Sequence, residues 1–574
     1  MHHFRFHLKT RYKTILSLAL GLIILSLLFV PKPTLSSPLQ GGVFTNAQVA
    51  RGQVAYEKRC ASCHGLQLDN GTAAALIGGK FMAKWAGKPV DDLYYITKTQ
   101  MPYGAGGTLT DKEYIDAVAF VLKANGYAAG AQELKADPAV LKQIKIEPQR
   151  TSKDSAVAVQ PSEAKPTVAA AGPATKLPSQ AELNAAEANT TDWLASNHDY
   201  SGQRYVDLKQ INQRNVASLR PACLFQASDT KAFHTNPVVY RGVMYFTTST
   251  STIAIDATNC KQKWRHNWRP KSIEVWPPNR GVAIKDGRVV RATTDGYMLA
   301  LDMETGQVLW EKKVVDSAKN EGSFNGAPVI FEDLIILGLG VSEQGVRGWV
   351  GAFKLEDGEQ VWRFNSIPNA GEPGSETWGS AEGMLHGGGA VWAPMSLDAE
   401  AGLVYVPIAN PAPDFHDDNR PGTNLYTNTM MVLDARTGKM KWYYQSMPHD
   451  THDYDTTQVS PLFTSTVGGK RRKLVAVSGK DGLMHVLDRE TKEHLYEVPV
   501  TTRLNVEVPL SSTEAIRVCP GVLGGVQWNG PAFNPLTNML YVNAVDWCGT
   551  FREAKEARFV AGQIYMGGSH IADP

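Results

Sequence analysis

The chain has 574 residues, enough for two or three domains and at least one well-filled hydrophobic core. Its 58 basic and 56 acidic residues nearly cancel and leave a formal net charge of +2. This balance excludes an electrostatic argument for nucleic acid as a partner. Composition alone leaves the substrate class open.

The N-terminus carries the pattern of an export signal. A basic stretch from Arg5 to Lys13 precedes residues 14–30, which are uncharged and largely apolar. We therefore predict a signal peptide or signal anchor over residues 1–40. The apolar run is long for a cleaved signal and short for a span of ~20 residues, so cleavage and membrane anchoring by residues 14–30 both stay open. The remainder is expected in the periplasm, either free or anchored to the inner membrane.

Residues 41–127 are predicted to form a small all-α domain. The segment Cys60-Ala-Ser-Cys63-His64 spaces two thiols to bond both vinyl groups of one haem and places an imidazole on the iron, which predicts a cytochrome c domain. A zinc or dithiol-redox site would need a second ligand pair or a βαβ frame, and the neighbouring sequence has neither. The motif therefore predicts haem c.

The sixth iron ligand is predicted to be Met101. It stands in Gln100-Met101-Pro102-Tyr103-Gly104, where Pro and Gly favour an open loop and the thioether supplies a soft axial ligand. Met82 is the competing thioether, but it lies in a helical pattern that favours a role in core packing.

Residues 128–190 are rich in Ala, Pro, Gln, Lys and Ser and have almost no aromatic side chains. Such a segment buries too little apolar surface to order itself, which predicts a disordered linker.

Beyond the linker, residues 191–574 show short β-rich runs and a recurring turn motif at steps of ~50 residues, typical of propeller blades. An Asp turn leads to an aromatic residue that is expected to pack between blades. The copies are Asp256 to Trp264, Asp302 to Trp310, Asp357 to Trp362, Asp434 to Trp442 and, degraded, Asp488 to Tyr496.

The propeller region resembles the PQQ-dependent alcohol dehydrogenases, a family that includes methanol dehydrogenases and quinohaemoprotein alcohol dehydrogenases. The resemblance begins at Asp199-Tyr-Ser-Gly-Gln-Arg-Tyr205 and continues through separated blocks in the family's order. It implies an all-β propeller, eight-bladed in the family. Family members continue for roughly two further blades after the position that corresponds to Pro574. Three explanations for this difference stay open: the chain is a fragment, another chain completes the propeller, or the fold is smaller than that of the family.

By resemblance, several residues form a site for PQQ and a metal ion. Glu343 in Gly340 to Gly348 is implied as a metal ligand, and Asn410 in Asn410-Pro-Ala-Pro413 as the second. Asp453, in His449-Asp-Thr-His-Asp453-Tyr-Asp455, matches the catalytic aspartate and is expected to act as general base and also to be a ligand of the metal. The implied cofactor contacts are Trp392 as the floor under the quinone, Arg280 and Lys480 as cations for its carboxylates, and Asn325, Gln527 and Trp528 as further wall residues.

A hard cation polarises the quinone carbonyl and makes its carbon electrophilic enough to accept hydride from an alcohol. The oxygen ligands suit calcium or a lanthanide, and both stay open. Asp455 adds a carboxylate at the position where lanthanide-using methanol dehydrogenases carry one. We therefore expect it to contribute to the metal site and to favour a trivalent ion.

The expected function is oxidation of a small alcohol, with electrons passing singly to the chain's own haem and on to a downstream cytochrome or oxidase. Three alternatives stay open: a sugar or polyol dehydrogenase, a polyvinyl-alcohol dehydrogenase, and an electron carrier with an inactive, partner-binding propeller. The vicinal cysteine pair of many relatives is replaced by Glu274-Val275. The resemblance implies a disulfide Cys519–Cys548, and position in the blade suggests Cys223–Cys260.

Overall fold

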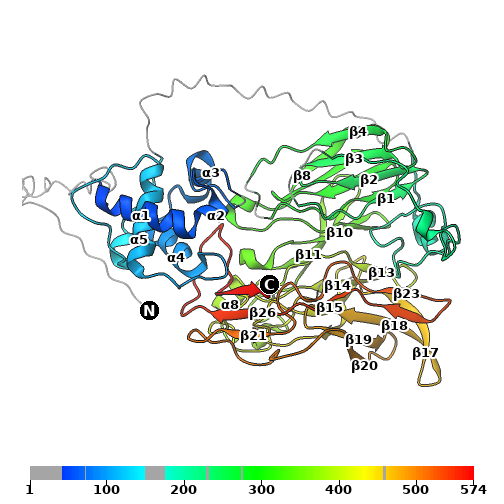
Figure 1. Cartoon of the computed structure of the whole chain (residues 1–574). Helices are drawn as coiled ribbons and strands as arrows, with labels where there is room; N and C mark the ends of the chain where they lie inside the picture. The colour runs from blue at the N-terminus through cyan, green and yellow to red at the C-terminus, as the bar shows by residue number, and fades with distance from the viewer. Residues whose placement is uncertain are drawn as a thin grey trace, which may run out of the picture. The chain divides into compact units, whose positions relative to one another are not determined.

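The structure is a computed structural model that describes residues 42–71, 73–148, 175–227, 232–272, 274, 276–456 and 460–574. The described residues divide into two compact units, one of 42–94 and 111–148 and one of 95–110 and 175–574. Figure 1 shows the helices of the first unit in blue and cyan, and the strands of the second from green to red.

The N-terminal region is helical, as predicted for a cytochrome. Its helices are α1 (Asn46–Arg59), α2 (Ala61–His64), α3 (Gly78–Trp85), α4 (Val90–Gln100), α5 (Asp111–Ala124) and α6 (Pro138–Leu141). The side chain of Thr45 caps α1 by accepting a hydrogen bond from the backbone N–H of Gln48. Gly52 lets α1 approach α5 closely, because a Cβ there would lie 1.9 Å from the carbonyl oxygen of Asp116. Arg51 of α1 also pairs with Asp116 of α5 at 2.8 Å.

The segment expected to be a linker is described only at its two ends, and both hold secondary structure. Residues before 149 include α6, whose Leu141 is fully buried, and residues after 174 include α7 (Gln180–Asn184), whose Leu183 is buried. The expected disorder over 128–190 therefore does not apply to these ends. The predicted export signal lies outside the described residues. None of the described helices combines the length and the apolar character of a membrane span.

Among the described residues, five four-stranded antiparallel sheets form the repeated part of the propeller, each with its strands in sequence order. The first blade contains β1 (Val238–Tyr240), β2 (Val243–Thr247), β3 (Ser251–Asp256) and β4 (Gln262–Asn267). The second contains β5 (Ala283–Lys285), β6 (Arg288–Ala292), β7 (Tyr297–Asp302) and β8 (Val308–Lys313). The third contains β9 (Val329–Phe331), β10 (Leu334–Gly338), β11 (Trp349–Lys354) and β12 (Gln360–Asn365). The next two are β13 (Ser396–Asp398) to β16 (Met440–Gln445) with β14 (Leu403–Ile408) and β15 (Thr429–Asp434), and β17 (Leu462–Val467) to β20 (His494–Pro499) with β18 (Lys470–Ser478) and β19 (Leu483–Asp488).

The recurring motif connects the third and fourth strand of each blade and ties neighbouring blades together. The indole N–H of Trp264 donates to the carbonyl of Met303 at 3.0 Å, in the corresponding turn of the next blade. Trp310 and Trp362 repeat this bond to the next turn. Each turn glycine has a positive φ and faces the preceding tryptophan: a Cβ on Gly306 would lie 2.5 Å from the Trp264 ring. The predicted packing of the motif between blades is confirmed for Trp264, Trp310 and Trp362, whereas Tyr496 of the degraded copy is 38% exposed.

The last part of the described chain forms three smaller sheets. They contain β21 (Ile516–Val518), β26 (Gly549–Glu553) and β27 (Gly568–Ala572); β22 (Gly525–Val526) and β25 (Ala544–Val545); and β23 (Ala532–Asn534) and β24 (Met539–Tyr541). Both predicted disulfides, Cys223–Cys260 and Cys519–Cys548, are present. The predicted fold class, a small all-α cytochrome domain followed by an all-β propeller, is confirmed.

Candidate active site

The predicted site residues lie in connections that leave the blades at the same end. Glu343, Asn410 and Lys480 each follow the second strand of a blade, β10, β14 and β18 respectively, whereas Arg280 and Asp453 lie between the fourth strand of one blade and the first strand of the next. Because neighbouring strands run antiparallel, these two kinds of connection emerge at the same end of a blade. Asn325 and Trp392 occupy blade-to-blade connections of the same kind.

Three carboxylates form the centre of the site. Oxygens of Glu343, Asp414 and Asp453 all lie within 4.8 Å of one another. Asp414 and Asp453 are almost fully buried, and burial raises the pKa of each well above its ordinary value. Burial, together with the charge of Asp455, also raises the pKa of Glu343. A buried group of acids with raised pKa values is a site that a cation would stabilise.

Asn410 joins this group through its amide. Its Nδ2 donates to Asp414 Oδ1 at 3.1 Å, while its buried Oδ1 has no hydrogen-bond partner among the described residues. The second oxygen of Asp414 is likewise buried without a hydrogen bond in the described part of the chain. Buried oxygens without donors are costly unless they bind a cation, so the residues present fit a hard metal ion.

Asp414 is a further acidic residue of this site, which we did not predict from the sequence. It follows directly after Asn410-Pro-Ala-Pro413, the stretch quoted for Asn410. An aspartate after a proline turn usually caps backbone amides. The one sequence feature that could have identified Asp414 was its position four residues after Asn410, a predicted metal ligand.

The loop that carries Asp453 is shaped by a buried aspartate. One oxygen of Asp450 accepts the backbone N–H of His452 at 2.8 Å, and the other accepts that of Tyr454 at 2.7 Å. These bonds fix a tight turn in which Asp453 has a φ of 61°, a left-handed conformation uncommon for a side-chain-bearing residue. Asp455 then accepts the backbone N–H of Asn410 at 2.9 Å, which links the two predicted metal-binding segments.

Lys480 lies against both aspartates of this loop. Its Nζ is 2.9 Å from each carboxylate oxygen of Asp453 and 2.6 Å from Asp455. Burial alone would lower the pKa of Lys480, but the charges of Asp453 and Asp455 outweigh it and raise that pKa. The lysine therefore stays charged and holds the Asp453 carboxylate in a fixed orientation. Its predicted contact with PQQ stays a prediction.

Arg280 and Trp392 form a second part of the site. The guanidinium lies over the Trp392 ring at 4.4 Å, and its Nε and Nη1 are buried with no hydrogen bond among the described residues. Burial lowers the pKa of Arg280 to about 10. The amide oxygen of Asn325 is buried and also lacks a donor within the described segments. A flat ring beneath an arginine with free N–H donors fits a planar, carboxylate-bearing cofactor such as PQQ.

Within the described residues, two predicted wall residues form their hydrogen bonds and ring contacts outside this cluster. The amide of Gln527 donates to the backbone carbonyls of Val522 and Gly524. Trp528 is 36% exposed and stacks on His234, with ring centroids 5.0 Å apart. Their roles at the cofactor stay predictions.

The haem motif is arranged for iron binding. Cys60 and Cys63 are not in a disulfide, and His64 is buried at the end of α2. The Nδ1 of His64 lies 2.7 Å from the carbonyl oxygen of Ala74. Because a carbonyl only accepts, Nδ1 carries the hydrogen and Nε2 keeps a lone pair, as the predicted ligation of the iron requires. Met101 directly follows α4, and its ligation of the iron stays a prediction.

Two family profiles match the chain. Residues 193–503 match the PQQ family, described as the β-propeller domain of glucose, ethanol and alcohol dehydrogenases. Residues 47–121 match subunit III of cbb3-type cytochrome c oxidase. These matches agree with haem c in the N-terminal region, and with PQQ and a calcium or lanthanide ion in the propeller.

The chain is also similar in sequence to individual quinoprotein alcohol dehydrogenases. The chain is 32% identical to quinohemoprotein alcohol dehydrogenase ADH IIB of Pseudomonas putida, over 69% of this chain and 61% of that protein. It is 31% identical to the lanthanide-dependent methanol dehydrogenase of Methylacidiphilum fumariolicum, over 68% of this chain and 70% of that protein. It spans less than two thirds of ADH IIB and 56% of quinohemoprotein alcohol dehydrogenase of Comamonas testosteroni.

Solved structures give the same result. A europium-containing methanol dehydrogenase matches with a TM-score of 0.64 and 29% identity, covering 68% of this chain and 75% of that one. The crystal structure of the Comamonas testosteroni enzyme matches with a TM-score of 0.62 and 28% identity, covering 69% and 67% of the two chains. Blade repeats, a buried acidic site and these matches agree, and the chain belongs to the PQQ-dependent glucose, ethanol and alcohol dehydrogenase family.

Proposed function

We propose that this chain oxidises a small alcohol at metal-bound PQQ, with Asp453 as the general base. The observation that carries the proposal is the group formed by buried Asp414, buried Asp453 and half-buried Glu343, with Lys480 against Asp453. A non-catalytic propeller has no need to gather three carboxylates and bury two of them, since this costs folding free energy without a bound cation.

The described residues have distinct roles in this proposal. Glu343, Asn410, Asp414 and Asp453 supply oxygen ligands to the metal ion, and Arg280 pairs with a carboxylate of the cofactor. PQQ, when bound, supplies the electrophilic carbonyl carbon that accepts hydride, and haem c supplies a one-electron carrier.

Asp453 takes the proton from the substrate hydroxyl group. Lys480 contacts both of its oxygens, so the carboxylate cannot rotate freely. Burial raises the pKa of Asp453 in the protein alone, and an adjacent cation lowers it again because it favours the charged form. The metal ligands therefore also adjust the basicity of Asp453.

The electron path and location are further parts of the proposal. The combination of a PQQ-family propeller and a cytochrome domain in one chain supports transfer of single electrons to the chain's own haem. A separate cytochrome or an oxidase in the periplasm would then accept them. The export pattern in residues 1–40 supports that compartment.

The test is dye-linked oxidation by the full chain loaded with PQQ and either calcium or lanthanum, with primary alcohols, polyols, sugars and polyvinyl alcohol as substrates. We expect small alcohols to be oxidised fastest. Asp453→Asn should lower the rate by about 10²–10⁴-fold while cofactor binding persists. Asp418→Asn is the matched control, since that side chain is 84% exposed.

Two results would contradict the proposal. If Asp453→Asn oxidises alcohols at the wild-type rate, Asp453 is not the base. If loaded wild-type protein oxidises none of these substrates, the propeller is a non-catalytic part of an electron carrier. A preference for sugars or polyols would instead change the assigned substrate class.

A further inference from the structure

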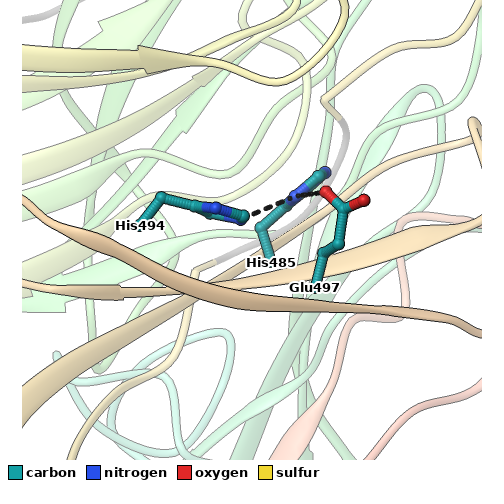
Figure 2. Close-up of side chains that lie close together, drawn as sticks. All are labelled: His485, His494 and Glu497. Carbon is teal, nitrogen blue, oxygen red and sulfur yellow. Dashed lines mark hydrogen bonds and ion pairs between the residues drawn. The ribbon is translucent and has the colours of Figure 1, made fainter.

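A second group of possible metal ligands lies on the β19–β20 hairpin, among residues to which we assign no catalytic role. Figure 2 shows His485, His494 and Glu497 with their side chains directed toward one another. We propose that these three residues bind a divalent transition-metal ion of the zinc class. The ion would join two adjacent strands of one blade.

The strand pairing explains how the three side chains meet. His485 of β19 is the direct cross-strand partner of Glu497 of β20. His494 is three residues before Glu497, which in a regular strand would place the two on opposite faces. A bulge opposite Val486 and Leu487 shifts the register between them. Such an extra residue turns the strand and re-aims side chains, so His494 and Glu497 reach the same side.

The separations suit a tetrahedral ion. Nδ1 of His485 is 3.2 Å from Nε2 of His494 and 3.3 Å from Oε2 of Glu497, and ligand atoms of all three lie within 4.8 Å. Bonds of about 2.0–2.1 Å at tetrahedral angles place ligand atoms about 3.3 Å apart. The side chains therefore need little movement to bind zinc.

Hydrogen bonding alone does not satisfy this cluster. Nδ1 of His485 also lies 3.1 Å from the hydroxyl of Tyr444, which brings its close polar neighbours to three. An imidazole nitrogen carries either one hydrogen or one lone pair, so it forms one good in-plane hydrogen bond. A cation between His485, His494 and Glu497 would interact favourably with all three ligand atoms.

The other nitrogen of His485 is an independent observation. Its Nε2 is buried and lacks a hydrogen bond in the described part of the chain, and so does Oδ2 of the buried Asp481, 4.0 Å away. Metal binding at Nδ1 requires that Nε2 carry the hydrogen, which then faces this carboxylate. A carboxylate behind a ligating histidine is the usual arrangement in zinc sites.

The ligand types set this site apart from the active site. Two imidazoles and one carboxylate favour Zn²⁺, Ni²⁺ or Cu²⁺, whereas the oxygen-only ligands near Asp453 favour calcium or a lanthanide. Three protein ligands also leave one coordination position for water. Because the two sites prefer different metals, zinc can be added while calcium occupies the active site.

The test is calorimetric titration of Zn²⁺ into the haem-loaded full chain in excess calcium. His494 and Glu497 are exposed, so His494→Gln and Glu497→Gln are expected to fold, which thermal unfolding in a chelator checks. We expect each variant to weaken one zinc site about tenfold or more. Glu490→Gln, an exposed change in the same hairpin, should bind as wild type. Zinc X-ray absorption should detect two imidazoles per site ion.

The proposal is overturned if wild type and His494→Gln bind the same number of zinc ions with the same affinity. It is also overturned if the absorption spectrum of zinc-loaded wild type shows no imidazole ligand.

Discussion

At the residue scale, Asp414 is expected to destabilise the metal-free protein and to stabilise the metal-bound protein. Burial raises the pKa of Asp414, so its contribution to folding stability is present below the pKa of the unfolded chain, about 3.9, and is lost as pH rises through the folded pKa. Asp414→Asn keeps the acceptor for Asn410 and removes the charge. We expect a higher Tm in metal-free protein at neutral pH, a difference that shrinks on acidification, and metal binding about tenfold weaker or more.

Thermal unfolding with and without calcium measures both effects, and Asp418→Asn is again the control. A lower Tm of the metal-free Asp414→Asn protein at neutral pH, with unchanged metal affinity, would contradict this role.

Asp455 is the residue that bears on the choice of metal. It lies against Lys480 and accepts the backbone N–H of Asn410, a predicted metal ligand. An additional carboxylate favours a trivalent ion because Coulomb attraction scales with the product of the charges. We expect wild type to prefer lanthanum, and Asp455→Ala to lower the lanthanum-to-calcium activity ratio about tenfold or more.

Reconstitution of metal-free protein with PQQ and either ion measures this ratio. Calcium activity that equals or exceeds lanthanum activity in wild type, and does not respond to the substitution, would show that the charge argument is wrong.

Met101 is the predicted sixth ligand of the haem iron. Loss of its thioether should remove the weak charge-transfer band expected between methionine sulfur and ferric iron. The visible spectrum of oxidised Met101→Ala measures this, with Met82→Ala as the matched control because Met82 lies in α3. An unchanged band in Met101→Ala would exclude Met101 as the sixth ligand. Loss of the band in Met82→Ala instead would assign that role to Met82.

At the element scale, the turn glycines determine how closely neighbouring blades approach. A Cβ on Gly306 would lie 2.5 Å from the Trp264 ring, and its φ is +72°. Gly469 has a similar φ of +76° but nothing within 4 Å of a Cβ. We expect Gly306→Ala to cost about 1–3 kcal/mol more than Gly469→Ala, since only the first adds crowding to the backbone strain. Denaturant unfolding measures both; equal costs would show that interblade packing is not limiting.

The sequence predicts the elements better than it predicts the side chains that meet at the site. The spacing from Asp302 to Trp310 identifies a blade turn, because its chemistry is local. Asp414 was missed because an aspartate after a proline turn is usually a cap, and its local sequence does not indicate its approach to Glu343 and Asp453. His494 and Glu497 meet only through a bulge, which no residue pattern in β20 identifies.

At the scale of the whole molecule, the chain combines a haem-binding region with a propeller of the PQQ family. We propose that this combination allows one chain to take two electrons from a substrate and to release them singly. The predicted ligands for each cofactor lie in separate stretches, Cys60 to Met101 for the haem and Arg280 to Trp528 for PQQ and its metal.

The most direct test of this account is haem reduction in the full chain. Oxidised protein loaded with PQQ and calcium or lanthanum is mixed anaerobically with a small alcohol, without dye, and the haem absorption band is followed in time. We predict that the haem is reduced in wild type and that Asp453→Asn slows its reduction by about 10²–10⁴-fold. A haem that stays oxidised in wild type while dye-linked alcohol oxidation proceeds, or equal rates in both proteins, would contradict the account.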